Sequence, residues 1–259
     1  MKRIEKIMSI LDLESRVDIT ELAKKFGVSE ITIRRDMEML ENQGVVTRTL
    51  RGATINRENI FKIPYLERMK KNIQEKRAIA RKALSYISPA DTIVICNGTT
   101  TYQLAKILRN AKMELRVFTN ALDSAIELAY SDYITTIVAG GQVTESYTIE
   151  ILGDSKISNQ IGTIDKMFIG GDGVDLEHGL TSFSTLDVEA NHIMMKGVRE
   201  IIVLIDHNKF DVIRYGKLLP LECINVLVTD DGLSDSIAQK YKERGVNLVL
   251  AETSKISVR

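Results

Sequence analysis

The segment 29–40 constrains the fold most, because it combines an apolar helical stripe with polar side chains at its start. Ile33, Met37 and Leu40 recur at helical spacing and are expected to face a core. Ser29 is a candidate N-cap, since its hydroxyl can accept a hydrogen bond from a free backbone N–H of the first turn. The pattern predicts a short amphipathic helix with its polar side chains away from the core.

A second short helix is predicted over 18–26, with Asp18 or Thr20 as its cap and Glu21 placed for a capping box. Its apolar side chains are Leu22, Ala23 and Phe26. Gly27 separates the two helices, and glycine is the usual residue where a helix ends with a positive φ. An earlier helix is predicted near 3–13, with an apolar stripe of Ile4, Ile7, Ile10 and Leu11. Two short helices joined by a glycine-containing turn form a helix-turn-helix.

A basic, β-rich segment follows the second of these helices, which is expected to stop at Gly44. Residues 45–55 predict a hairpin with Gly52 as a turn candidate, and a hairpin in this position is typical of a wing. In such domains the second helix lies in the major groove of DNA, where arginine contacts phosphates or pairs with guanine edges. The candidate DNA-binding residues are Ser29, Glu30, Thr32, Arg34, Arg35, Arg48 and Arg51. A small helical bundle with surface arginines is the alternative, since basic and acidic residues balance from 29 to 54.

Composition permits two domains and excludes some classes of protein. The chain has 259 residues, 44% of them hydrophobic, which allows a small domain plus one of ordinary size. Its 35 basic and 35 acidic residues cancel, so DNA binding must rest on a local surface and not on net charge. Cys96 and Cys223 are too few for a disulfide framework, and the sequence shows neither a signal peptide nor a membrane-length apolar run. We therefore expect a cytoplasmic protein without a membrane partner.

The segment from about 56 to 82 connects the two parts and is strongly basic from 61 onward. Its basic residues are Lys62, Arg68, Lys70, Lys71, Lys76, Arg77, Arg81 and Lys82. A run of this kind is typical of a solvated helix face, and contact with the DNA backbone is the alternative.

Beyond residue 90, buried-strand runs alternate with helical patterns. Strands are predicted at 91–96, 115–119, 134–139, 166–170, 200–206, 225–229 and 247–250. Helices are predicted at 99–108, 121–130, 187–198 and 234–244. Alternation of this kind indicates an α/β domain with a largely parallel, Rossmann-like sheet. Ligands of such sheets bind at the carboxyl ends of the strands.

Those predicted strand ends carry the polar signals of a ligand site. The segment 97–101 opens a helix, where backbone N–H groups, hydroxyls and the helix dipole favour an anion such as phosphate. Asp172 and Asp175 suit sugar hydroxyls, and Lys209 adds a cation at the same edge. The candidate effector-binding residues from this pattern are Asn97, Gly98, Thr99, Thr100, Thr119, Asn120, Gly140, Gly141, Asp172, Asp175 and Lys209.

Nucleotide and metal sites are not indicated. Neither a dinucleotide-binding fingerprint nor a P-loop occurs in the sequence. His178 and His192 lack metal-ligand companions at close spacing, and with His207 they are expected to be solvent or turn residues. We therefore expect no cofactor and no metal.

At its helix-turn-helix the chain resembles the DeoR family of bacterial regulators of sugar metabolism. The string VSEITIRRD at 28–36 matches the family pattern, with Met37 in place of the usual leucine. The family wing ends R-x-H-G-G-A, and here Leu50 and Arg51 replace the histidine and one glycine. The resemblance implies a winged helix-turn-helix domain at 1–57, a linker at 58–74 and an effector-binding sensor domain at 75–259.

The resemblance continues through the second domain. The segments 96–100, 119–121, 170–175 with 179–181, and 206–210 stand where the family has D-S-G-T-T, T-N-S, G-A-D-G-I-D with G-L-T, and D-x-S-K-F. The family's sensor domain is similar in fold to ribose-5-phosphate isomerase, and Asp172, Asp175 and Glu189 match the acidic part of that enzyme's site. No lysine lies between Asp175 and Glu189, so the resemblance implies a site that binds a sugar phosphate without turning it over.

Three positions depart from the family pattern within this domain. Cys96 and Asn97 replace the usual aspartate and serine, and Asn191 stands where many members have lysine. We interpret Cys96 as a core thiol. These departures bear on which sugar is bound, or on whether the anion site is retained.

The sequence thus predicts a DNA-binding transcriptional regulator with no catalytic residues. By family habit it is expected to repress a carbohydrate or polyol operon, to respond to a phosphorylated sugar, and to act as a dimer or tetramer on double-stranded operator DNA. Two alternatives remain open. One is a sugar-phosphate isomerase with an accessory DNA-binding domain, and the other is an effector-independent DNA binder with a decayed sensor site.

Overall fold

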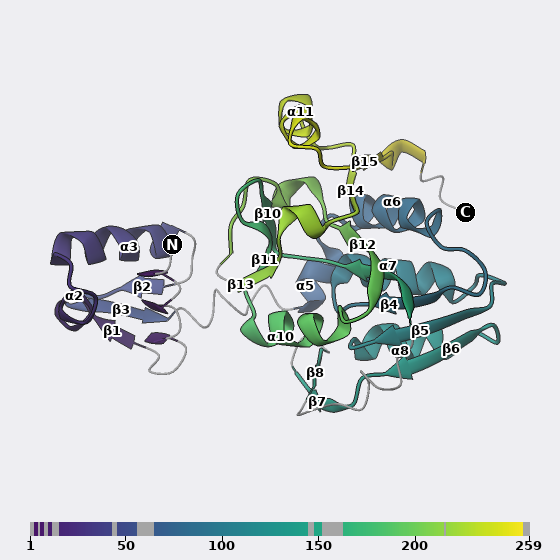
Figure 1. Ribbon diagram of the computed structural model, residues 1–259, viewed down its shortest axis with the longest axis horizontal. Helices are drawn as coiled ribbons and strands as arrows, with labels where there is room; N and C mark the ends of the chain where they lie inside the picture. The colour runs from purple at the N-terminus through teal and green to yellow at the C-terminus, as the bar shows by residue number, and fades with distance from the viewer. Residues whose placement is uncertain are drawn as a thin grey trace. The chain divides into compact units, whose positions relative to one another are not determined.

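The computed structural model describes residues 3–4, 6–7, 10–11, 16–42, 46–55, 65–144, 148–151, 163–214 and 216–255. They belong to two compact units, Met1–Pro64 and Tyr65–Arg259 (Figure 1). Within the described part of the chain, no helix is both long and apolar enough to cross a membrane.

The first unit combines short helices with a small antiparallel sheet. Residues 3–4, 6–7 and 10–11 are helical. The elements that follow are β1 (Arg16–Asp18), α2 (Ile19–Phe26), α3 (Glu30–Asn42), β2 (Val46–Arg48) and β3 (Gly52–Ile55). The strands pair in the order β1-β3-β2. The predicted helix-turn-helix and hairpin are therefore confirmed, and β1 is an addition that the sequence pattern did not predict.

Local hydrogen bonds explain where the two helices begin and end. The Asp18 carboxylate accepts from the N–H group of Thr20 at 2.8 Å and thereby caps α2. Gly27 ends α2 in the left-handed region with φ of 65°, as predicted. The Ser29 hydroxyl accepts from the N–H group of Thr32 at 3.3 Å in the first turn of α3.

The apolar side of α3 forms the centre of the first unit's core. Ile33, Met37 and Leu40 are buried, as their spacing predicts. Buried apolar residues from the other elements are Ile7, Leu11, Val17, Ile19, Leu22, Ala23, Val46 and Ala53. On the same helix, the nearly buried Asp36 carboxylate accepts from Arg3 Nε at 2.6 Å and from a second guanidinium nitrogen at 3.0 Å. This two-point contact ties residue 3 to α3.

Gly52 was predicted as a turn residue, and the structure places it instead as the first residue of β3. A Cβ atom at this position would lie 1.8 Å from the carbonyl oxygen of Val17, which belongs to β1. The turn itself lies just before Gly52, where the Thr49 N–H donates to the Gly52 carbonyl at 2.9 Å. Glycine is therefore required for the close approach of two strands and not for a positive φ.

The second unit is built on a seven-stranded parallel sheet, as predicted, in the order β15-β14-β12-β9-β4-β5-β6. Its strands are β4 (Thr92–Ile95), β5 (Leu115–Thr119), β6 (Ile134–Val138), β9 (Ile164–Ile169), β12 (Val198–Leu204), β14 (Val226–Asp230) and β15 (Leu248–Ala251). The chain runs from β4 outward to β6 and returns to the other side of β4 as β9. This reversal makes the carboxyl ends of β4 and β9 the topological switch point of the sheet, where ligands of open α/β sheets bind.

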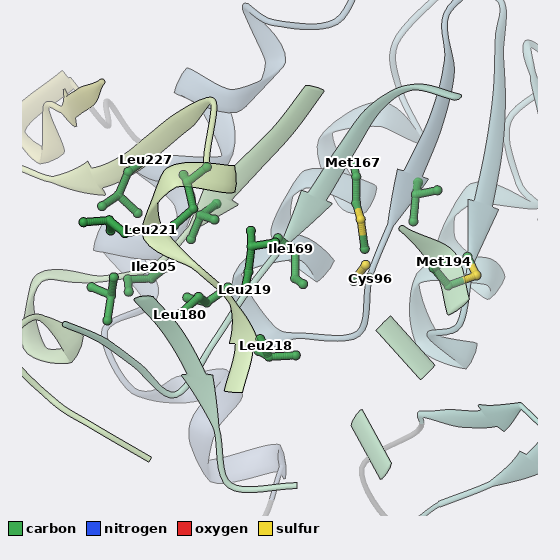
Figure 2. Close-up of a cluster of buried hydrophobic side chains, with 14 of the residues drawn as sticks. Cys96, Met167, Ile169, Leu180, Met194, Ile205, Leu218, Leu219, Leu221 and Leu227 are labelled. Carbon is green, nitrogen blue, oxygen red and sulfur yellow. The ribbon is translucent and has the colours of Figure 1, made fainter. Parts of the chain in front are cut away.

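Helices cover both faces of this sheet (Figure 1). They are α5 (Tyr65–Lys70), α6 (Ile73–Leu84), α7 (Thr99–Leu108), α8 (Leu122–Leu128), α10 (Thr185–Met194) and α11 (Asp235–Glu243). Ile93 and Ile95 of β4 share one buried cluster with the apolar sides of α6, α7 and α8. Val94 and Cys96 face the opposite cluster (Figure 2), which includes residues of α10 and α11. Both faces of β4 are therefore apolar, as expected of a central parallel strand.

Cys96 is fully buried, and the interpretation as a core thiol is confirmed (Figure 2). Burial, together with the negative charge of Asp187, raises the pKa of this thiol above its usual range. Cys96 therefore acts here as a small apolar side chain at the end of β4.

Short strands and turns outside the main sheet complete the second unit. The strands are β7 (Gly141–Val143) with β8 (Ile149–Ile151), and β10 (Gly173–Asp175) with β11 (Gly179–Ser182) and β13 (Gly216–Leu219). The 3-10 turns are η1 (His207–Lys209), η2 (Leu221–Cys223) and η3 (Thr253–Lys255). None of these small sheets was predicted, and the helix expected at 187–198 ends as α10 at Met194 because Val198 opens β12.

Candidate functional site

The polar side of α3 is exposed in the first unit. Glu30, Arg34 and Arg35 are exposed, and Thr32 is half-buried. Arg34 lies 3.8 Å from Glu30 across one helical turn, a surface ion pair of little stability. The two arginines are therefore presented outward and can exchange such a contact for phosphate or base edges.

The wing beside α3 is also polar at its base. The Glu41 carboxylate accepts from Arg48 Nε at 2.6 Å and from the Arg48 N–H at 3.2 Å, so it orients this arginine. Arg51 is exposed, and Leu50 at the tip is 95% exposed. An open hollow of about 440 Å³ lies between helix and wing. It is lined by Ile19, Arg34, Glu41, Arg48, Thr49, Leu50 and Gly52.

In the second unit, Asn97 and Asn120 meet at the carboxyl ends of β4 and β5. The Asn97 N–H donates to Asn120 Oδ1 at 2.9 Å, and the Asn97 amide group donates to the Thr148 hydroxyl beside β8. Three atoms around this contact are buried without a partner among the described residues: Asn97 Oδ1, Asn120 Nδ2 and Ser124 Oγ. Unpaired buried donors and acceptors are costly, so this edge is suited to a ligand rich in hydroxyl groups.

Asp172 lies at the carboxyl end of β9 and is held by protein donors. Its Oδ2 accepts from the Ser182 hydroxyl and from the Phe183 N–H, both at 3.2 Å. Its Oδ1 lies 3.4 Å from an Arg68 guanidinium nitrogen. Burial alone would raise the pKa of Asp172, but the charges of Lys209 and Arg68 hold it below the usual range. This carboxylate is therefore ionised and able to accept hydrogen bonds from a ligand.

Two further cations, Lys209 and Arg214, lie near enough to Asp172 to interact with its charge. Lys209 Nζ donates to the carbonyl of Gly171. The Arg214 guanidinium lies 4.3 Å from the centre of the Phe183 ring, and the Asp172 charge partly offsets the lowering of the Arg214 pKa by burial. Arg214 Nε is buried without a described partner. A carboxylate for hydroxyl groups and cations for an anion thus occupy one region.

Asp187 of α10 links the two groups of residues. Burial and the nearby charge of Asp172 raise the pKa of Asp187 to about 6, while the charge of Arg68 and hydrogen bonds from Thr148 and Ser184 act in the opposite direction. Asn191, one turn later, donates to the Asp187 carbonyl at 2.7 Å, and its Oδ1 is buried without a described partner. The chain of contacts therefore runs from the β4 end through Thr148 and Asp187 to Asp172.

Comparison with known proteins decides the family. Residues 3–59 match the model of the DeoR-like helix-turn-helix domain, and residues 71–231, more than half of the chain, match the model of the DeoR C terminal sensor domain. The chain belongs to the DeoR family. This DeoR-family member is therefore a DNA-binding transcriptional regulator with a C-terminal sensor domain, as its motifs predicted.

Relatives of this DeoR-family chain match it nearly end to end. It is 32% identical over 253 residues to the HTH-type transcriptional regulator GolR of Listeria innocua, covering 97% of this chain and 98% of the relative. It is 29% identical over 245 residues to the lactose phosphotransferase system repressor of Lactococcus lactis, covering 93% and 95%. Ribose 5-phosphate isomerase A from Neisseria gonorrhoeae matches 54% of this chain and 53% of its own, at 16% identity and a TM-score of 0.39, a level that carries no functional argument.

Most of the predicted effector residues of the DeoR-family sensor lie in or next to the region just described. Asn97, Asn120, Asp172 and Lys209 lie in the connected region just described. Thr119 lies beneath it and is fully buried, with its hydroxyl donating to the Ile95 carbonyl at 2.6 Å. Gly98, Thr99 and Thr100 open α7.

The remaining predicted residues of the sensor lie outside that network of contacts. Asp175 Oδ1 accepts from the Glu177 N–H, the His178 N–H and His178 Nδ1, so it closes the turn between β10 and β11. Gly140 and Gly141 are exposed at the end of β6 and the start of β7, and Glu189 is exposed on α10.

The structure brings to this candidate site residues that the sequence pattern did not single out. Arg68 and Lys76 belong to the basic run that was interpreted as a solvated helix face, yet Arg68 pairs with Asp172 and Lys76 is buried. Lys70, Lys71, Arg77, Arg81 and Lys82 of the same run are exposed, as predicted. Thr148 and Asp187 carry no local motif. In α6, Lys76 lies at helical spacing from the apolar residues Ile73 and Ala80. This spacing was the one signal in the sequence that Lys76 is buried.

Proposed function

We propose that this DeoR-family regulator represses a carbohydrate or polyol operon and that a phosphorylated sugar bound to its sensor domain changes its affinity for operator DNA. The observation that carries this proposal is that two features occur in one region. Buried polar atoms without a described partner lie around Asn97, and an ionised carboxylate lies near cations at Asp172. A sugar phosphate supplies both hydroxyl groups and an anion. The name of the lactose phosphotransferase system repressor supports the same direction of regulation and a carbohydrate operon.

The roles of the residues follow from their chemistry. Asn97, Asn120 and Asp172 are proposed to bind sugar hydroxyls, since an amide group both donates and accepts hydrogen bonds and an ionised carboxylate accepts them. The phosphate is proposed to lie near Lys209 and the start of α7, where a cation and free backbone N–H groups favour it. The effector acts only if it binds one conformation better than another.

On the DNA side, α3 is proposed to enter the major groove with Arg34 and Arg35, while the wing contacts the backbone through Arg48 and Arg51. Ser29, Glu30 and Thr32 lie at the N-terminal end of α3, where recognition helices contact base edges. We also propose a dimer or tetramer acting in the cytoplasm, because two recognition helices are needed to read two half-sites.

We propose that the sensor binds its ligand without chemical turnover. Asp172 has a lowered pKa and is a poor base at neutral pH. The named relatives are transcriptional regulators. Incubation with ribose 5-phosphate is expected to give no ribulose 5-phosphate, and turnover that disappears in Asp172→Ala would instead support an isomerase.

The experiment is a gel-shift titration of the full chain on DNA upstream of its own gene. It is repeated with glucose 6-phosphate, fructose 6-phosphate, fructose 1-phosphate, ribose 5-phosphate and glycerol 3-phosphate. At least one compound is expected to change the operator Kd and to raise the melting temperature of the free protein. Operator binding with no response to any compound in either assay would favour an effector-independent DNA binder.

A further inference from the structure

The segment that opens the second unit is fastened to the proposed effector site. Helix α5 starts at Tyr65, the first residue of this unit. The Tyr65 hydroxyl hydrogen-bonds to Asp123 Oδ2 at the start of α8, and Arg68 reaches Asp172 at the end of β9. Both ends of the short helix are therefore held by carboxylates near the carboxyl edge of the sheet.

The turn after α5 is held at the same edge. Lys76 is buried, and its Nζ donates to the carbonyl of Arg68 and, at 2.7 Å, to the carbonyl of Lys71. Asn72 adopts φ of 52° and donates through Nδ2 to Asp206 Oδ1 at 3.0 Å, at the end of β12. The backbone of α5 is thus tied to residues that flank the proposed ligand position.

Among these contacts, the one between Arg68 and Asp172 is the weakest and the most exposed to competition. The N–O distance is 3.4 Å, and the Arg68 side chain is 38% exposed. Asp172 Oδ2 is occupied by Ser182 and Phe183, whereas Oδ1 faces Arg68. Oδ1 is the atom that remains for a ligand hydroxyl.

We propose that Arg68 senses effector occupancy, because a sugar hydroxyl that donates to Asp172 Oδ1 displaces the guanidinium and removes the contact that ties α5 to the end of β9. This inference rests on the proposed function, since it needs a hydroxylated effector at Asp172. In this proposal Arg68 competes with the ligand for Asp172 Oδ1. The position of α5, which directly follows the first unit in the chain, then depends on whether the ligand is bound.

Competition makes an unusual prediction for Arg68→Ala. The ligand no longer has to break an ion pair, so the variant is expected to bind the effector more tightly, by about three- to fivefold for a partly exposed pair. The operator Kd of this variant is expected to change little on adding effector, because the contact between α5 and Asp172 is already absent. Because coupling between two sites is reciprocal, the lost operator response and the tighter effector binding have the same cause, the missing contact between Arg68 and Asp172.

The test uses the full chain and the sugar phosphate from the panel above that raises the wild-type melting temperature most. Isothermal titration calorimetry measures its Kd, and the gel shift measures the operator Kd with and without it. Arg68→Lys keeps a cation beside Asp172 and is expected to retain the response. Arg81→Ala removes an exposed arginine of α6 and serves as the matched control with wild-type values.

Tighter effector binding and a lost operator response in Arg68→Ala, with both preserved in Arg81→Ala, would support the proposal. Unchanged or weaker effector binding in Arg68→Ala, or an intact operator response in this variant, would overturn the proposed role of Arg68. The proposed function would still stand in that case, provided that the wild-type protein responds to the effector. A wild-type protein that responds to none of the compounds would overturn both.

Discussion

Gly52→Ala tests the packing of the winged domain most sharply. The added Cβ atom would lie 1.8 Å from the Val17 carbonyl oxygen, 2.9 Å from its carbonyl carbon and 3.1 Å from the Asp18 Cα atom. All three are backbone atoms of β1, so no side-chain rotation can relieve the clash. The strands must move apart by more than 1 Å, and the pairing of β1 with β3 is lost at this end.

The cost of this change follows from two contributions. Forcing extra volume into a packed site costs about 1–3 kcal/mol, and each lost backbone hydrogen bond about 1 kcal/mol. We expect the first unit to lose about 3 kcal/mol or more. The Ile19 N–H, which donates to the Arg51 carbonyl at 2.9 Å, lies next to the clash, so α2 is expected to loosen as well.

Hydrogen exchange of the full chain, followed by mass spectrometry of peptides from β1, α2 and β3, measures this loss directly. Gly27→Ala is the matched control, because its Cβ would meet nothing within 4 Å and only the φ of +65° is strained, at about 1–2 kcal/mol. Peptides from β4 and β9 report the second unit and should not change. Protection in Gly52→Ala equal to that in Gly27→Ala would refute the argument.

Three further predictions concern individual side chains. Asp187→Asn is expected to stabilise the protein above pH 6 by at most about 3 kcal/mol and not below pH 4. The reason is that burial and the Asp172 charge raise the Asp187 pKa to about 6, so the folded wild-type protein loses stability as pH rises through the range from 4 to 6. Thermal melts of both proteins from pH 4 to 8 would show this loss in the wild type alone. Parallel curves of melting temperature against pH for wild type and variant would contradict the prediction. Lys76→Ala should cost about 1–3 kcal/mol in urea unfolding, since two backbone carbonyls lose their buried donor; a smaller loss would mean that water replaces the ammonium group. Arg34→Ala or Arg35→Ala should weaken operator binding by about 1–3 kcal/mol if the side chain makes a bidentate base contact, and full affinity in the double variant would show that α3 is not the recognition helix.

Regular periodicity made much of the fold predictable from the sequence. The strand at 115–119 and the helix at 99–108 were predicted at their observed bounds, because an apolar run and a helical stripe are local patterns. The Asp18 cap and the Gly27 helix end were predictable for the same reason, since each depends on neighbouring residues only.

Features that depend on distant partners were not predictable. Strand β1 has three residues, and only its pairing with β3 makes it a strand. Gly52 was predicted as a turn residue because glycine is common in turns. The structure requires glycine there for another reason, since the Val17 backbone, far away in sequence, leaves no room for a side chain. Short strands of this kind carry too few residues to show alternation.

The geometry of the candidate sensor site was predictable only in part. Strand ends could be read because parallel strands bring their carboxyl ends to one edge, and this placed Asn97, Asn120 and Asp172 together. Arg68 looked like one of many surface cations, because its role depends on a carboxylate 104 residues later in the chain. Asp187 had no motif, and its proximity to Asp172 arises from the packing of α10 against β11 and β13.

The most direct test of the account is the operator Kd of the full chain measured with and without sugar phosphates on DNA upstream of its own gene. We predict specific binding that at least one phosphorylated sugar changes severalfold, and we predict that Asp172→Ala binds the same DNA but no longer responds. Specific binding that no sugar phosphate alters, or a response that survives in Asp172→Ala, would contradict it.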